Sequence, residues 1–152
     1  MIENTKIDHL SLLIQQHHDL KELSNTAQEI METASFAELK KIIQYLFQRT
    51  IEHVDQEEEI LFPLLKDMYY PNDQEISSFL IEEHAQIRKQ LDVLVHELEA
   101  AEKQLHQPNL QYSLQCILIN QLEHIFKEEQ VLFPLIKKHL SRTAKESRHL
   151  PS

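Results

Sequence analysis

Residues 52–63 read Glu-His-Val-Asp-Gln-Glu-Glu-Glu-Ile-Leu-Phe-Pro, and residues 123–134 read Glu-His-Ile-Phe-Lys-Glu-Glu-Gln-Val-Leu-Phe-Pro. Both segments follow the pattern E-H-x-x-x-E-E-x-(I/V)-L-F-P, at an offset of 124 − 53 = 71 residues. This offset is close to half of the 152-residue chain. The repeat therefore indicates two similar helical hairpins, which can pack with a pseudo-two-fold axis between them.

Four long amphipathic patterns surround this repeat. Apolar residues recur three and four positions apart over about residues 5–31, 36–68, 74–106 and 110–140, which is the spacing of one face of an α-helix. Ser35 is a candidate N-cap for the second helix, with Glu38 three residues later. Turn signals occur at residues 70–73 and 107–109, each of which contains a proline beside an asparagine.

The chain contains no glycine, which argues against a strand-rich fold because tight turns and bulges between strands favour that residue. The sequence predicts an all-α protein, an up-down-up-down antiparallel four-helix bundle over residues 1–140 with a flexible tail over residues 141–152. Pro63 and Pro134 are expected to end or kink the second and fourth helices near their C-terminal turns.

The charge and composition exclude several classes of protein. A formal net charge of −10 argues against binding to nucleic acids or anionic membranes, since little positive charge is available to neutralise phosphates. No apolar run approaches the roughly 20 residues that cross a bilayer, and the first residues do not resemble a signal peptide. Cys116 is the only cysteine, so no internal disulfide can form. We therefore expect a cytoplasmic protein.

The histidine and the glutamate in each copy of the repeat, His53 with Glu57 and His124 with Glu128, lie four residues apart. Residues at this spacing lie on one helix face, one turn apart, so both side chains can reach the same point beside the helix. Imidazole and carboxylate groups together suit Fe, Mn or Zn, and bridging carboxylates suit a pair of cations. The repeat therefore predicts a metal site between the second and fourth helices.

Each of the other two helices offers a histidine that faces the predicted core. His84 lies on the apolar stripe of the third helix. On the first helix, His17 has Leu13 and Leu20 on its face, so it is favoured over its neighbour His18, which is kept as the alternative. The predicted metal ligands are four histidines and two bridging carboxylates: His17, His53, Glu57, His84, His124 and Glu128.

Each of these features has a simpler explanation when it is taken alone. A single histidine on an apolar face is more often a hydrogen-bonded core residue than a ligand, and a run of glutamates is usually a solvated surface. Their coincidence in two matching halves favours a metal site, because burying such groups without a cation would be costly. A Zn-bound or metal-free structural bundle is the alternative. No general acid–base pair apart from the ligands can be read, so the sequence assigns no catalytic reaction.

With these motifs, about residues 5–140 resemble a hemerythrin-like domain of the HHE cation-binding family. The resemblance rests on the first-helix histidine, the two His-x-x-x-Glu pairs, His84, and the Leu-Phe-Pro that follows both pairs. It implies a four-helix bundle with two irons bridged by the two carboxylates and by an oxo or hydroxo group, with Zn or Mn as alternative metals. It also implies binding of a small diatomic ligand such as O₂ or NO, or redox work with it.

Two positions differ from the oxygen-carrying members of that family. Those proteins have a second histidine one turn after the third-helix histidine, where this chain has Arg88. They also carry His-x-x-x-x-Asp on the fourth helix, where this chain has His-x-x-x-Glu, ending at Glu128. In both positions the chain resembles the iron–sulfur cluster repair proteins and the iron-sensing hemerythrin-like domains. This resemblance implies binding or sensing of O₂, NO or peroxide in oxidative or nitrosative stress, with iron sensing or donation as the alternative.

Overall fold

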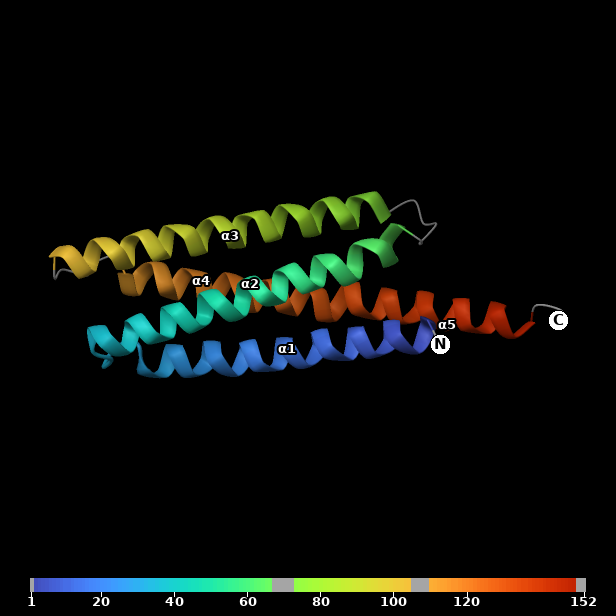
Figure 1. Cartoon of the computed structure of the whole chain (residues 1–152), viewed down its shortest axis with the longest axis horizontal. Helices are drawn as coiled ribbons and strands as arrows, with labels where there is room; N and C mark the ends of the chain where they lie inside the picture. Colours follow the sequence, from blue (N-terminus) through green and yellow to red (C-terminus); the bar gives the residue numbers. More distant parts are fainter. Residues whose placement is uncertain (1, 67–72, 105–109, 150–152) are drawn as a thin grey trace.

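The computed structural model describes residues 2–66, 73–104 and 110–149, which are almost entirely helical (Figure 1). The elements are α1 (Ile2–Ile30), α2 (Phe36–Lys66), α3 (Asp73–Gln104), α4 (Leu110–Lys127), the short π-helix η1 (Glu128–Leu132) and α5 (Phe133–His149). α4, η1 and α5 follow one another directly and form the fourth rod. No described residue lies in a β-strand, so the predicted all-α four-helix bundle is confirmed. Among these residues, no helix combines the length and the apolar character that a bilayer crossing requires.

The four rods close into a bundle. α1 contacts α2, α2 contacts α3, and α3 contacts α4, while α1 also contacts α4 and α5. Successive rods run in opposite directions (Figure 1). Residues from all four rods can therefore meet at one height in the common interior.

The connection between α1 and α2 lies within the described residues and follows the predicted capping pattern. The backbone N–H of Glu38 donates to Ser35 Oγ at 3.2 Å, and this bond satisfies one of the free donors in the first turn of α2. At the end of α1, the backbone N–H of Thr33 donates to the carbonyl of Ile30 at 3.2 Å. The turn predicted at residues 107–109 lies outside the described residues, as does the one at 70–73 apart from the first residue of α3.

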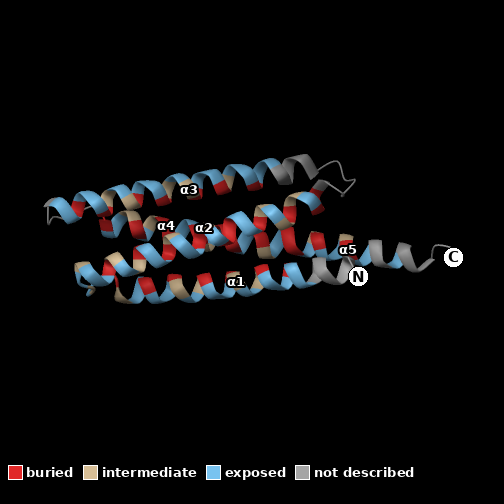
Figure 2. Ribbon diagram, viewed as in Figure 1, coloured by how far each residue is buried: buried red, intermediate tan, exposed pale blue. Residues whose placement is uncertain are grey.

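The interior consists of two apolar clusters with a polar layer between them. One cluster, which includes Leu46, Leu91 and Leu114, fills the end where α1 runs into α2. The other, which includes Leu13 and Leu61, fills the opposite end. Figure 2 shows the buried residues on the inward faces of the rods and the exposed residues outside. The buried histidines and glutamates of the polar layer are thus shielded from water by leucines on both sides.

Pro63 and Pro134 were expected to end or kink their helices. Neither proline ends its helix. Pro63 lies inside α2, which continues to Lys66. In the fourth rod, the N–H of Phe133 bonds to the carbonyl of Glu128, which makes the wider turn of a π-helix just before Pro134. Pro134 has no N–H to donate and its ring crowds the preceding turn, so a widened turn accommodates it. Because Pro63 leaves α2 in the α form, the proline alone does not dictate this turn.

The fourth rod is longer than the sequence predicted. Its expected end at Leu140 is wrong, because α5 continues to His149. The apolar stripe fades after residue 140, and this loss of pattern suggested a tail. Helical hydrogen bonds need no apolar stripe, however, so the rod continues beyond the residues that it buries. The division into a bundle and a flexible tail at residue 141 stays a prediction.

Replacing a buried leucine in this framework should cost far more stability than replacing its exposed neighbour. Leu13 is 0% exposed and Leu12 is 45% exposed. We expect Leu13→Ala to lower the free energy of unfolding by about 2–5 kcal/mol, because it leaves a cavity beside the polar layer. Leu12→Ala should change it by less than about 1 kcal/mol. Urea denaturation of the metal-free protein measures both values, and equal losses would contradict the assigned burial.

Candidate metal centre

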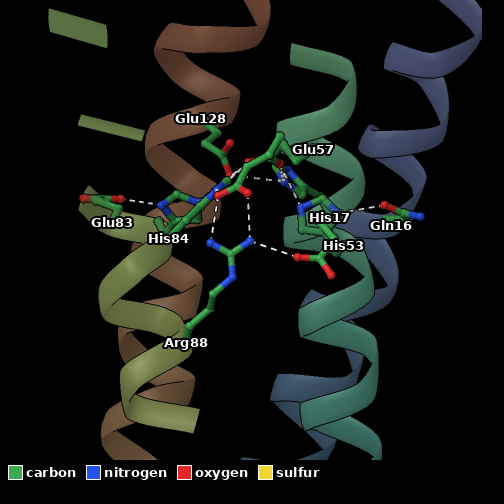
Figure 3. Close-up of polar contacts among 11 residues, drawn as sticks. Gln16, His17, His53, Glu57, Glu83, His84, Arg88 and Glu128 are labelled. Atoms are coloured by element: carbon green, nitrogen blue, oxygen red, sulfur yellow. Dashed lines mark hydrogen bonds and ion pairs between the residues drawn. The ribbon is translucent and has the colours of Figure 1, made fainter. Parts of the chain in front are cut away.

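Six buried side chains from all four rods meet in the polar layer (Figure 3). They are His17 on α1, His53 and Glu57 on α2, His84 on α3, His124 on α4 and Glu128 at the start of η1. The spacing of four brings each repeated pair together. His53 Nε2 lies 2.9 Å from Glu57 Oε2, and His124 Nε2 lies 2.7 Å from Glu128 Oε1. All six residues of the set predicted from the sequence are therefore in one cluster.

Each of the two carboxylates lies between histidines from both halves of the chain. Glu57 Oε2 is 3.2 Å from His17 Nε2, and Glu57 Oε1 is 2.9 Å from His84 Nε2. Glu128 Oε1 is 3.5 Å from His17 Nε2, in addition to its contact with His124. The six residues form two groups that could each hold a metal ion, one with His17 and His53 and one with His84 and His124, and both groups contain Glu57 and Glu128. Within each group, the donor atoms lie within 4.8 Å of one another.

The structure distinguishes the two histidines that competed on the first helix. His17 is fully buried, with its ring in the cluster. The side chain of His18 is 63% exposed and contacts Glu22 at 3.2 Å on the outer face of α1. One residue turns a helix by about 100°, so only one of the two neighbours can face the interior.

Several buried polar atoms of the cluster make no hydrogen bond of good geometry, although they lie close to other polar atoms of the cluster. Among the described residues these include Nε2 of His53, Nε2 of His124 and both carboxylate oxygens of Glu128. Each such atom costs about 1–3 kcal/mol when it is left unpaired in an interior. A cation bound by these atoms would satisfy them, and nitrogen and oxygen donors of these types suit Fe, Mn or Zn. The residues therefore fit a metal ion.

The second ring nitrogen of each histidine lies beside a polar side chain on the outer side of the cluster, and three of the four donate a hydrogen bond to it. His53 Nδ1–H donates to Gln16 at 2.8 Å, His84 Nδ1–H donates to Glu58 at 3.1 Å, and His124 Nδ1–H donates to Glu83. His17 Nδ1 lies 3.4 Å from Glu129. Partners of this kind hold the ring in place and leave Nε2 free to face a metal.

These outer partners were not identified from the sequence. Glu58 and Glu129 directly follow the central carboxylates, and the 100° turn of one helical residue points them away from those carboxylates. They reach the outer side of histidines on the neighbouring helix. Gln16 and Glu83 directly precede His17 and His84. Their position next to a predicted ligand in the sequence could have identified these four outer partners. That position does not indicate which histidine each of them contacts.

Three cations close the outer ring by binding its carboxylates. Arg88 donates two bonds to Glu58, at 2.9 and 2.8 Å, and one to Asp55 at 2.9 Å. Lys21 pairs with Glu129 at 2.6 Å, and Lys127 pairs with Glu83 at 2.9 Å. Because every outer carboxylate of the ring is paired with a cation, the ring adds little net charge near the central carboxylates.

The charges in the cluster shift its pKa values strongly. Burial lowers the pKa of His17, but hydrogen bonds and charges from Glu128 and Glu57 outweigh burial and raise it to about 9. The pKa of His124 is raised to about 11 against burial, chiefly by Glu128 and Glu57. Burial also opposes ionisation of Glu57, yet its hydrogen bonds with Glu128 and the histidines hold its pKa well below the usual range. Burial, followed by the charge of Glu57, raises the pKa of Glu128.

Fold and site together define a metal-binding four-helix bundle. The chain matches the family model of the hemerythrin HHE cation-binding domain over residues 8–136. This match covers most of the chain, so the protein belongs to the hemerythrin HHE cation-binding family. No curated protein and no solved structure matches the chain significantly.

Metal binding should release protons, because a ligating imidazole must be neutral at the nitrogen that binds. The raised pKa values of His17 and His124 lie above neutrality, at about 9 and 11. Both rings are therefore in the charged, doubly protonated imidazolium form in the metal-free protein at about pH 6–8. The apparent affinity should therefore rise with pH across this range, by up to about tenfold per pH unit for each proton released. Calorimetry in buffers of different ionisation enthalpy counts the protons, and an affinity independent of pH would contradict the account.

Proposed function

We propose that this protein is a non-haem di-iron protein whose metal pair is held by the six residues of the cluster. The ion at the α1–α2 position would be bound by His17 and His53, and the ion at the α3–α4 position by His84 and His124. Glu57 and Glu128 would bridge the two ions. The observation that carries this proposal is that the two possible metal-binding groups share both carboxylates, an arrangement that suits two neighbouring, bridged cations.

The same cluster supports a role with small oxidising or diatomic molecules such as O₂, NO or peroxide. Each ion would receive two imidazoles and two carboxylates from the chain, which leaves positions of an octahedral ion for a small ligand. Bound iron would supply redox activity and Lewis acidity at those positions. The chain itself holds three of the four rings by hydrogen bonds to their outer partners, and the leucine clusters on both sides exclude bulk water. We propose that the protein binds or senses such a molecule in the response to oxidative or nitrosative stress.

Arg88 supports sensing or reaction over oxygen transport. It stands where the oxygen-carrying relatives described above have a further histidine. Its guanidinium binds Glu58 and Asp55, so this position adds a fixed positive charge outside the cluster and no further imidazole to the metal ions.

A second candidate function, iron sensing or donation, is favoured by a cavity beside one ligand. A cavity of about 320 Å³ opens between α1 and α2 next to Gln16 and His53. Its lining carries three carboxylates, from Asp19, Glu22 and Glu52, with one guanidinium, from Arg49. A net negative lining attracts cations, so iron could reach or leave the α1–α2 position by this route.

The two neighbouring histidines of α1 provide a matched test of the ligand assignment. The wild type should bind about two iron ions per chain, one for each of its two candidate groups. His17→Ala removes one imidazole from the α1–α2 position and should lower the content to about one ion or less. His18→Ala, on the exposed face, should leave the content unchanged. Elemental analysis of proteins with equal helical circular dichroism measures this, and equal losses in both variants would refute the assignment.

The reaction with small molecules is tested on protein loaded anaerobically with iron(II). Exposure to O₂, NO or azide should produce new absorption in the visible range, and His17→Ala should weaken it. An iron-loaded protein whose spectrum changes with none of the three would contradict the sensing role. Transfer of its iron to a metal-free cluster protein in that case would favour iron donation, and zinc as the metal of the isolated protein would favour a structural role.

A further inference from the structure

The outer partners of the cluster follow the internal repeat, but the two halves of the chain carry different residue types at two equivalent positions. His53 and His124 are equivalent at the repeat offset of 71, and so are Gln56 and Lys127 (127 − 56 = 71). On the other two rods, Gln16 and Glu83 each directly precede the equivalent histidine of their helix. The chain thus places two glutamines in one half where it places a glutamate and a lysine in the other.

The contacts turn this difference into two distinct environments. In the first half, His53 Nδ1–H donates to Gln16 Oε1 at 2.8 Å, and Gln16 Nε2 donates to Gln56 Oε1. In the second half, His124 Nδ1–H donates to Glu83 Oε2, and Lys127 Nζ donates to Glu83 Oε1 at 2.9 Å. One histidine is therefore supported by a chain of neutral amides and its counterpart by an ion pair.

The other two histidines differ in the same direction. His84 Nδ1 makes a hydrogen bond of 3.1 Å with Glu58, which is itself held by two bonds from Arg88. His17 Nδ1 lies 3.4 Å from Glu129 but makes no hydrogen bond. Both ligands of the α3–α4 position thus donate a hydrogen bond to a carboxylate. At the α1–α2 position, His53 donates to an amide, and the contact of His17 with Glu129 is longer, at 3.4 Å.

A carboxylate that accepts from the outer nitrogen of an imidazole increases electron density at the inner nitrogen and makes it a stronger metal ligand. Outer partners of this kind change metal affinity by about 10–100-fold. A neutral amide oxygen carries no full charge and has a weaker effect. Equal numbers of imidazoles and shared carboxylates therefore do not give the two positions equal affinity.

We infer that the two metal positions are inequivalent: the α3–α4 position fills first and holds its ion tightly, and the α1–α2 position fills second and exchanges. Gln16 and Glu83 are the positioning residues that set this order. The inference rests on the proposed function, because it needs the two ions of the bridged pair. It adds that the protein passes through a one-ion form when metal is scarce and completes the pair only as metal becomes abundant.

Access to the two positions supports the same order. The cavity beside Gln16 and His53 has a volume of about 320 Å³, and the one beside Glu83 and His124 has a volume of about 150 Å³. Three carboxylates and one guanidinium line the larger cavity, and two carboxylates and one ammonium group line the smaller one. The weaker position thus adjoins the larger and slightly more acidic cavity, which favours faster exchange of cations there.

The test is a titration of the metal-free full-length chain with Co²⁺, followed by its d–d absorption. The wild type should show two dissociation constants that differ by about tenfold or more. His53→Ala should abolish the weaker constant and preserve the tighter one, and His124→Ala should do the reverse. Release of Co²⁺ to a chelator should be biphasic in the wild type, which tests the inequivalence without any variant.

Exchanging the outer partners provides matched variants. Gln16→Glu with Gln56→Lys builds the ion pair into the first half and should tighten the weaker constant by about tenfold. Glu83→Gln with Lys127→Gln builds the amide chain into the second half and should weaken the tighter constant by about the same factor. A merely structural role would move both constants together.

The outcomes separate this inference from the proposed function. Two equal constants with single-phase release, or a tighter constant that belongs to His53, would overturn the order while leaving the di-metal centre intact. Binding of no Co²⁺ by the wild type would overturn the di-metal centre itself. Two unequal dissociation constants in the wild type that become similar in each exchanged variant would support both the order of filling and the di-metal centre.

Discussion

The burial of Glu57 and Glu128 side by side is the constraint on which the rest of the structure depends. Each residue is at most 2% exposed, and the two lie between two leucine-rich clusters. Moving a carboxylate into such an interior costs several kcal/mol unless positive charge and hydrogen bonds compensate for it. One imidazole from each rod surrounds the pair, and in the metal-free state protons on His17 and His124 supply part of the compensation. A pair of cations would supply it more completely.

The duplication of one hairpin explains how a short chain builds this arrangement. Each hairpin contributes two imidazoles and one carboxylate, and the two carboxylates lie among the histidines at the centre (Figure 3). The residues next to these ligands then form an outer ring with Arg88, Lys21 and Lys127. The inner ligands are nearly symmetric while the outer ring is not, so the two metal positions can differ without any change in the ligands themselves.

The sequence predicted the features that depend on local spacing. Apolar periodicity gave the four helices, and the spacing of four brought His53 to Glu57 and His124 to Glu128. The features it missed depend on how one helix is rotated against another. The contacts of Gln16 with His53 and of Glu83 with His124 join residues 37 and 41 positions apart, and no local pattern fixes such a pairing. The π-helix that begins at Glu128 could not be predicted, because the same motif occurs in both halves. Pro134 follows a π-helix, whereas the equivalent Pro63 lies in a regular α-helix.

The most direct test of the di-metal centre is anomalous diffraction at the iron absorption edge from crystals of the iron-loaded protein. A di-iron centre should give two anomalous peaks, one beside His17 and His53 and one beside His84 and His124, with the carboxylates of Glu57 and Glu128 between them. A structure with no peak among these residues would contradict the account. So would a single peak bound elsewhere on the chain.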